Sequence, residues 1–294
     1  MLALIPSVEP SERASVGQSA NSVKTELQSE YDAAMSALST GPTAESLDVT
    51  LPGVPPVVGG LHVTRQTMYE IQRIFATMGF TVFESNEVET DEYNFQLLNI
   101  PPEHPSRDMW DTMYLEEGQV LRTHTSPGQI RAMQRFHPEP IRIILPGRCY
   151  RYEAIDASHE SILFQVEGLA IGTGITLASL KGVFEAFARQ FFGKDRGVRF
   201  RGHYFPFTEP SVEIDISCNC EGRGCPVCKG TGWLELSGGG MVHPIVLENG
   251  GYDPAEVTGF AFGMGADRAA MLKHNIEDIR LLYTNDLRFL EQFT

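Results

Sequence analysis

The sequence predicts an α+β fold built on a largely antiparallel sheet, and three features lead to this prediction. Apolar or alternating stretches bounded by turn residues recur through the second half of the chain, as expected for strands. Helical stretches fall between them without the regular strand–helix–strand rhythm of a doubly wound fold. The 294 residues, 42% of them hydrophobic, suffice for one large domain with a sizeable core and an appendage.

The first 50 residues differ from the rest, because they are rich in Ser, Ala, Glu and Gln and contain no Phe or Trp. Apolar residues at helical spacing predict one amphipathic helix over 20–39, stopped by Gly41–Pro42. Such a helix is typical of a coiled coil or an interaction arm, and a frayed tail is the alternative. The Pro- and Gly-rich stretch 51–60 is interpreted as a linker.

Residues 61–294 have the pattern of a globular domain whose elements follow in an irregular order. A helix is predicted over 68–80, followed by a short strand over 81–85. The later elements are predicted as strands 141–153, 161–172, 198–207, 212–217 and 232–242, a helix over 176–193, and a strand, Gly-rich turn and helix over 260–275.

Charge and hydropathy restrict the class of protein. The formal net charge of −15 argues against a dedicated nucleic-acid binder, although a local groove or a partner could supply positive charge. No apolar run approaches the ~20 residues that a membrane span needs, and the first residues lack the pattern of a secretory signal. We therefore expect a soluble, cytoplasmic protein.

Four of the five cysteines lie together in the stretch CNCEGRGCPVC. Their spacing, C-x-C-x4-C-x2-C, suits a tight knuckle that holds a structural Zn²⁺ through four thiolates. Free or vestigial thiols, an iron–sulfur centre and disulfides are the alternatives, although clustered cysteines in an intracellular chain favour a metal over disulfides. The expected zinc ligands are Cys218, Cys220, Cys225 and Cys228.

The stretch GMGADR has a composition that suits phosphate binding. Gly263 and Gly265 would let a phosphate approach the backbone, and Arg268 would offer a guanidinium to its oxygens. A simple turn before a helix explains the same pattern, which lacks the full dinucleotide-binding spacing and a Walker lysine.

Two predicted strands carry paired polar residues at period two, which places each pair on one face. Arg151 and Glu153 in RCYRYE could bind an α-phosphate and an adenine amino group. Gln165 and Glu167 in FQVEG lie in an apolar strand, where a carboxylate needs a partner such as a substrate ammonium. A surface ion pair and a solvated edge strand are the purely structural explanations.

Two further stretches suggest a pocket. THTSPGQ contains His124 and Ser126 just before a Pro turn, and a lone histidine is more often a structural residue than a catalyst. YFPF spaces Phe205 and Phe207 by two residues, so the rings are expected to line one wall, either in the core or in an aromatic pocket.

Together and in this order, the patterns resemble motifs 2 and 3 of the class II aminoacyl-tRNA synthetases. Arg-x-Glu on a strand is followed much later by G-x-G-x-(D/E)-R at a helix start. Similarity to the α subunit of bacterial-type phenylalanyl-tRNA synthetases runs from about residue 50 to 294, and SERASVGQSANSVK resembles the end of that family's coiled-coil arm. The stretches that carry it are HPSRDMWDTMYL, LRTHTSPGQIR, YFPFTEPSVE, GMVHP, TGFAFGMG and NDLRFLEQF.

The resemblance implies a class II antiparallel sheet flanked by helices. It also implies a truncated N-terminal helical arm at 1–50, a linker at 51–60 and a catalytic domain at 61–294 with a four-cysteine insertion at 218–228. The implied activity is formation of phenylalanyl-adenylate from L-phenylalanine and ATP with Mg²⁺, then transfer to tRNA(Phe). The implied assembly is an (αβ)₂ tetramer with a β subunit.

The resemblance assigns an ATP site. Arg151 would hold the α-phosphate, Glu153 the adenine side and Arg268 the γ-phosphate, with both arginines acting in catalysis. Glu209 would help to bind Mg²⁺ at a site shared with the β subunit. The other ATP-binding residues would be His159, Gly263 and Gly265.

It also assigns a phenylalanine site. Gln165 and Glu167 would meet the substrate ammonium, and Phe205 and Phe207 would pack edge-to-face on its ring. Ala261 would bound the far end of the pocket, where a small side chain leaves room for phenyl. The remaining residues around the ammonium would be Trp110, His124 and Ser126.

Three positions depart from the family pattern. Asp267 replaces the Glu that precedes the motif 3 arginine, and Ser85–Asn86 replaces the Gly-Pro of the motif 1 strand. Leu163–Phe164 replaces Phe-His, so a polar group near the substrate is expected to be lost.

Two other functions stay open. A paralogue could form adenylates with another substrate, or regulate with an inactive site, but the retained substrate residues argue against it. A zinc-bearing RNA-binding module without catalysis is disfavoured by the acidic balance and the two-part ATP pattern.

Overall fold

The computed structural model describes the chain except residues 1–6, 40–49, 54–58, 219, 221–227 and 294. The chain divides into two compact units, Met1–Val58 and Gly59–Thr294. The expected helix stop at Gly41–Pro42 and the middle of the expected linker lie outside the described residues. No helix in the described ranges is long and apolar enough to cross a membrane.

The main element of the first unit is helix α1 (Arg13–Ser39). It confirms the helix predicted over 20–39 and extends it to Arg13. Along α1 the large apolar side chains are exposed, a pattern typical of a helix that packs against a partner. These side chains are Val16, Val23, Leu27, Tyr31, Met35 and Leu38.

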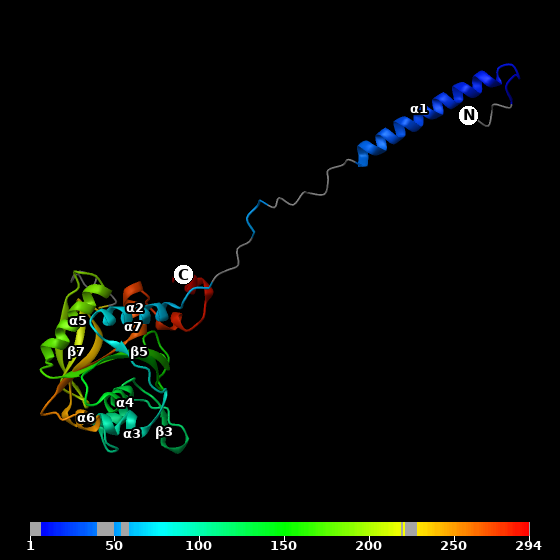
Figure 1. Ribbon diagram of the computed structural model, residues 1–294. Helices are drawn as coiled ribbons and strands as arrows, with labels where there is room; N and C mark the ends of the chain where they lie inside the picture. The colour runs from blue at the N-terminus through cyan, green and yellow to red at the C-terminus, as the bar shows by residue number, and fades with distance from the viewer. Residues whose placement is uncertain (1–6, 40–49, 54–58, 219, 221–227, 294) are drawn as a thin grey trace. The chain divides into compact units, whose positions relative to one another are not determined.

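The second unit is built on a seven-stranded sheet in the order β1-β4-β5-β9-β8-β7-β6 (Figure 1). Only β1 and β4 pair in parallel, and the other neighbouring pairs of this sheet are antiparallel, which confirms the α+β prediction. β2 and β3 form a separate two-stranded antiparallel sheet. The strands are β1 (Thr81–Val82), β2 (Val88–Thr90), β3 (Gln119–Leu121), β4 (Ile141–Tyr150), β5 (Ile162–Gly172), β6 (Val198–Phe205), β7 (Thr208–Ser217), β8 (Trp233–Val242) and β9 (Thr258–Gly265).

Helices lie on both faces of the sheet. Figure 1 shows α2, α5 and α7 on one side and α3, α4 and α6 on the other. The helices predicted over 68–80 and 176–193 are confirmed as α2 and α5 with shifted ends. The helices are α2 (Val63–Thr77), α3 (Asp91–Asn94), α4 (Pro127–Phe136), α5 (Leu177–Phe191), α6 (Pro244–Asn249), α7 (Ala266–His274) and α8 (Leu287–Leu290), with 3-10 turns at Gln96–Leu98, Pro105–Met109, Glu116–Gly118, Ile279–Leu282 and Glu291–Phe293.

Local sequence explains where several helices begin and end. Thr176 and Ser179 form a reciprocal capping box at the start of α5, which satisfies backbone donors that the helix leaves open. Pro127 and Pro244 occupy the first turns of α4 and α6, where a missing N–H costs nothing. Gly79 follows α2 with φ of 84°, a conformation that glycine adopts without strain.

Alternation along the strands gives the sheet two different faces. On one face, Val166 of β5 and Phe262 of β9 belong to the main core with residues of α2, α5 and α7. On the other face lie Gln165 and Glu167, and further along β5 Leu169 joins a second core cluster with residues of α4 and α6. The polar residues of the predicted site therefore share a face that α4 and α6 cover only in part.

The predicted strand 141–153 is too long. β4 ends at Tyr150, because its ladder with β5 begins at Ile162 and no partner residue continues it. Arg151 and Glu153 therefore lie in the segment after the strand, although the Arg151 N–H still donates to the Ser161 carbonyl at 3.0 Å.

The predicted Gly-rich turn is also wrong, since Gly263 and Gly265 lie within β9 and α7 begins at once at Ala266. The two glycines pair with Glu167 and Gln165 across the ladder. A Cβ on Gly263 would stand 2.7 Å from the Gln165 Nε2 atom, so the bare backbone makes room for these side chains.

Candidate active site

Glu167 is a buried carboxylate on the polar face of β5, with 3% of the residue exposed. It accepts hydrogen bonds from Ser126 Oγ at 2.9 Å and from Gln129 Nε2 at 2.6 Å. Burial raises the pKa of this carboxyl, and the two donors offset part of the rise. Gln165, on the same face, accepts from Cys149 Sγ at 3.3 Å. A carboxylate so buried favours a cationic partner.

Four aromatic side chains make a continuous line of ring contacts beside this acid. Ring centroids lie 4.7 Å apart for Trp110 and His124, 6.2 Å for His124 and Phe207, and 5.7 Å for Phe207 and Phe205. The two phenylalanine rings stack at 9°, which confirms that they line one wall. Phe205 lies over Gly238 of β8, where a Cβ would stand 2.6 Å from the ring.

His124 is buried, with 2% exposed, and neither ring nitrogen has a hydrogen-bond partner within the described part of the chain. Burial, and then the charges of Arg151 and Arg122, lowers its pKa to about 3. The imidazole is therefore neutral at physiological pH, with one donor and one acceptor to offer to a ligand.

Arg151 leaves the end of β4 and is held beside these rings. Its Nε donates to the Thr123 carbonyl at 3.2 Å, and its guanidinium carbon lies 5.2 Å from the centroid of Trp110. Its Nη1 lies 3.7 Å from Glu153 Oε1. These contacts orient a cation next to the aromatic line.

Ala261 and Arg268, two further residues of the predicted site, lie on β9 and α7. Ala261 is buried and belongs to the cluster against which Phe207 packs. Arg268 is the third residue of α7, and this helix begins directly after Gly265 of β9. Ala261 lies on the same face of the sheet as Glu167, because it pairs with Leu169 across the ladder.

Two predicted residues have local partners of their own. His159 is exposed, and its Nδ1 lies 3.0 Å from Asp156 Oδ1 in the loop before β5. The Glu209 side chain is 75% exposed, and its Oε2 lies 3.4 Å from His243 Nε2. Their described contacts are with these neighbours rather than with the aromatic line.

Sequence reasoning did not single out Gln129 and Arg122. Gln129 lies in the first turn of α4, three residues after Ser126, so both side chains reach the same carboxylate. Arg122 directly precedes the Thr-His-Thr-Ser stretch and is buried, with 2% exposed. The only sequence signal for either was its position beside residues already chosen.

Asp267 and Phe164, two of the departures, are in contact. The buried Asp267 carboxylate accepts from the Phe164 N–H at 2.7 Å, from Thr64 Oγ1 at 2.9 Å and from the Tyr283 hydroxyl at 2.9 Å. The Phe164 ring packs against the main core, on the opposite face from Gln165. The Phe164 ring therefore faces away from Gln165 and Glu167, because side chains alternate along β5. The loss of a polar group near the substrate at Leu163–Phe164 stays a prediction.

Asp267→Ala is expected to lower the free energy of unfolding by about 3 kcal/mol, because it leaves three donors without their acceptor. Tyr283→Phe removes one donor and is expected to cost about 1 kcal/mol. Urea denaturation of both variants measures the difference. Equal stability of wild type and Asp267→Ala would contradict the structural role given to this carboxylate.

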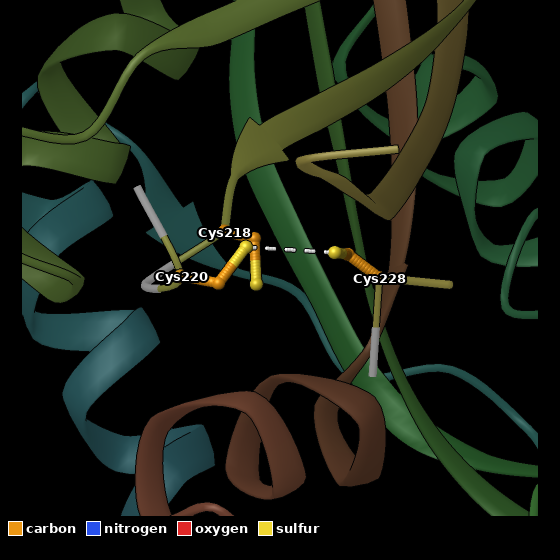
Figure 2. Close-up of side chains that lie close together, drawn as sticks. All are labelled: Cys218, Cys220 and Cys228. Atoms are coloured by element: carbon orange, nitrogen blue, oxygen red, sulfur yellow. Dashed lines mark hydrogen bonds between the residues drawn. The ribbon is translucent and has the colours of Figure 1, made fainter. Parts of the chain in front are cut away.

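Three cysteines of the cluster lie together between β7 and β8. Figure 2 shows the three side chains close together, with the sulfur of Cys220 pointing toward that of Cys228. The three Sγ atoms lie within 4.8 Å of one another, and those of Cys220 and Cys228 are 3.6 Å apart. Cys225 lies outside the described residues. The spacing of the three sulfurs fits a tetrahedral thiolate site.

Comparison with known proteins agrees with this geometry. The profile of the tRNA synthetases class II core domain (F) matches residues 46–293, and that of the aminoacyl tRNA synthetase class II N-terminal domain matches residues 1–47. The phenylalanine–tRNA ligase alpha subunit of Herpetosiphon aurantiacus is 53% identical over 98% of this chain and 87% of its own length. That of Roseiflexus castenholzii is 60% identical over 85% of this chain and 74% of its own length. That of an Exiguobacterium species is 52% identical over 96% and 85%.

Identity at this level over nearly the whole chain, together with a class II core on the observed antiparallel sheet, means that the chain belongs to the phenylalanine–tRNA ligase alpha subunit family.

Proposed function

We propose that this chain is the catalytic subunit of a phenylalanine–tRNA ligase, which activates L-phenylalanine with ATP and transfers it to tRNA(Phe). The observation that carries the proposal is the buried Glu167 carboxylate beside a line of aromatic rings. An acid and an aromatic wall on one sheet face are what an α-amino acid with a phenyl side chain requires.

Phenylalanine would bind with its ammonium on Glu167 and Gln165, and its ring would lie against Phe205 and Phe207. His124, whose nitrogens have no partner among the described residues, would bond a polar group of the substrate and so recover the free energy lost on burial. The pocket would be completed by Trp110, His124, Ser126 and Ala261.

The chemistry would be adenylate formation followed by acyl transfer. The substrate carboxylate attacks the α-phosphorus of ATP, a new O–P bond forms, and pyrophosphate leaves. Arg151 would stabilise charge on the α-phosphate and Arg268 on the γ-phosphate, with no need for a protein nucleophile. The terminal ribose hydroxyl of the tRNA then attacks the acyl carbon, and AMP leaves.

Other assignments follow the family likeness. Glu153, His159, Gly263 and Gly265 would line the ATP site. Glu209 offers Mg²⁺ a hard, exposed oxygen, but one carboxylate is too few for a complete site, which suits a site shared with a β subunit. Mg²⁺ would neutralise phosphate charge. We further propose residues 1–50 as a helical arm, 51–60 as a linker, 61–294 as the catalytic domain, and an (αβ)₂ assembly in the cytoplasm.

The test is phenylalanine-dependent ATP–pyrophosphate exchange, first on this chain alone and then after mixing with the β subunit of a bacterial relative. Exchange that depends on phenylalanine, and exceeds that with tyrosine or leucine, is the expected result. A folded mixture with β bound and no exchange would contradict the proposal and favour a paralogue with another substrate.

We also propose that the cysteine cluster holds one structural Zn²⁺. Cys228 is buried in the main core, and Cys218 and Cys220 pack against it. The Cys218 N–H donates to the Gly232 carbonyl at 2.8 Å, which closes the base of the insertion between β7 and β8. A metal here would brace this hairpin against the core rather than take part in catalysis.

Purified protein is expected to contain about one zinc ion per chain, as measured by inductively coupled plasma mass spectrometry. Cys228→Ser is expected to lose most of the metal and to unfold at a lower temperature. Cys149→Ser, at a cysteine far from the cluster in sequence, is the matched control and should keep the zinc. Wild-type protein from zinc-supplemented medium that carries no zinc would rule the site out.

A further inference from the structure

Arg122 is a buried cation whose hydrogen-bond acceptors are all neutral. Its Nε donates to the Arg148 carbonyl at 2.7 Å, and its Nη1 donates to the Asn86 carbonyl at 2.9 Å. The same Nη1 lies 3.1 Å from both the carbonyl and the hydroxyl of Ser85. No carboxylate of the described residues lies within ion-pair distance of this guanidinium. A charge buried in this way is costly and calls for a functional explanation.

The guanidinium lies directly over Gly147 of β4. A Cβ added there would overlap its Nη2 atom and would stand 3.0 Å from its central carbon. Gly147 pairs with Gln165 across the ladder, and two residues before it Leu145 pairs with Glu167. The Arg122 charge therefore lies on the polar face, one strand away from the two residues proposed to meet the substrate ammonium.

Arg122 also fixes the chain that leads into the site. Three of the four residues after it belong to the candidate site. The Thr123 carbonyl accepts from Arg151, His124 is buried, and Ser126 donates to Glu167. Its bonds to Ser85, Asn86 and Arg148 tie this segment to two other parts of the chain.

We propose that Arg122 is a positioning residue that holds the segment 122–126 in place and whose charge keeps Glu167 ionised for the substrate ammonium. The proposal rests on the function given above.

The groups that face Glu167 support this role. Ser126 and Gln129 donate hydrogen bonds to it but carry no charge. Cys149 on β4 is held neutral, because burial raises the pKa of its thiol to about 12. His124 is neutral as well. The hydrogen bonds from Gln129 and Ser126 oppose the rise in the pKa of Glu167 that burial causes, and the Arg122 charge lowers this pKa further.

Without the Arg122 charge, the pKa of Glu167 rises further, so the carboxyl is protonated at a higher pH and loses its attraction for the ammonium. Arg122→Gln is therefore expected to move the acid limb of kcat/KM for phenylalanine to higher pH. Arg122→Lys keeps the charge and should leave the limb in place, while kcat/KM falls at every pH because the fork of hydrogen bonds is lost.

The experiment measures exchange kinetics of the assembled complex with β, between about pH 5.5 and 8.5, a range that brackets neutral pH. Arg131→Gln is the matched control, since this arginine is bonded to its own carboxylate, Glu89, by two hydrogen bonds. It is expected to lower stability without moving the limb. An Arg122→Gln limb that coincides with that of wild type would overturn the proposal.

Two further measurements test the proposal if Arg122→Gln does not fold or if the wild-type complex shows no exchange. If Arg122→Gln does not fold, Gly147→Ala takes its place, because it displaces the guanidinium while the arginine remains. An unmoved limb in that variant would overturn the proposal. Wild-type complex without exchange would contradict the proposed function instead. In that case, calorimetric titration with L-phenylalanine across the same pH range would test the role of Arg122. An affinity for phenylalanine with the same pH dependence in wild type and in Arg122→Gln would overturn that role.

Discussion

Arg151→Ala is expected to slow phenylalanine-dependent ATP–pyrophosphate exchange by about two to three orders of magnitude, with a smaller change in KM for phenylalanine. Preorganised donors to charge that develops in the transition state are worth roughly 2–4 kcal/mol. Arg151 has this character, because the Thr123 carbonyl and the Trp110 ring hold its guanidinium before any substrate binds. Steady-state exchange at saturating ATP measures the loss.

Arg148→Ala is the matched control for this variant. Arg148 lies near the end of β4, three residues before Arg151, but its side chain is 49% exposed and bonds Glu87 at 3.1 Å. An exposed ion pair contributes little, so exchange should stay within about twofold of wild type. Equal losses in both variants would assign the Arg151 effect to a local structural change around the end of β4 rather than to a lost phosphate contact.

Glu167→Gln is expected to raise KM for phenylalanine by roughly a hundredfold, with little effect on KM for ATP. Loss of one partner of a buried charge pair costs about 3 kcal/mol, and the substrate ammonium is the proposed partner. The amide keeps the size of the side chain and can still accept from Ser126, so the pocket should keep its shape. Calorimetric binding of L-phenylalanine measures the same loss without catalysis.

Glu167→Gln should also change how the stability of the ligand-free protein depends on pH. Burial raises the pKa of Glu167 above its ordinary value of 4.5, so the folded state holds the proton more tightly than the unfolded state does. The stability that this provides is present below pH 4.5 and is lost as the pH rises through the raised value. Ligand-free wild type should therefore lose stability relative to Glu167→Gln over this window.

Glu89→Gln is the control for Glu167→Gln, because it removes the charge of another buried acid that is not proposed to bind phenylalanine. Glu89 is buried but accepts two hydrogen bonds from Arg131, so its loss should destabilise the protein. Its substitution should leave KM for phenylalanine near that of wild type. Denaturation and binding measured side by side on the two variants distinguish a substrate-facing acid from a structural one.

Sequence patterns predicted the family and the fold class, and both predictions are confirmed. The motif residues could be recognised from short stretches of sequence, because residues two apart on a strand share one face. This spacing places Gln165 and Glu167 together, and likewise Phe205 and Phe207, whose rings stack. The same local reasoning failed where elements end. The end of β4 at Tyr150 depends on where its partner strand begins, and α7 follows β9 without the turn that its glycines suggested.

The sequence by itself determined the order of the elements, the type of sheet and most of the residues proposed for the site, since periodicity and motif spacing act within a few residues. Only the tertiary structure decided which of these residues meet. It joined Ser126 and Gln129 to Glu167, brought Thr64 and Tyr283 to Asp267, and laid the Arg122 guanidinium over Gly147. The physical reason is that a buried charge must find its partners in space, and no pattern along the chain records which distant donors or bare backbone will provide them.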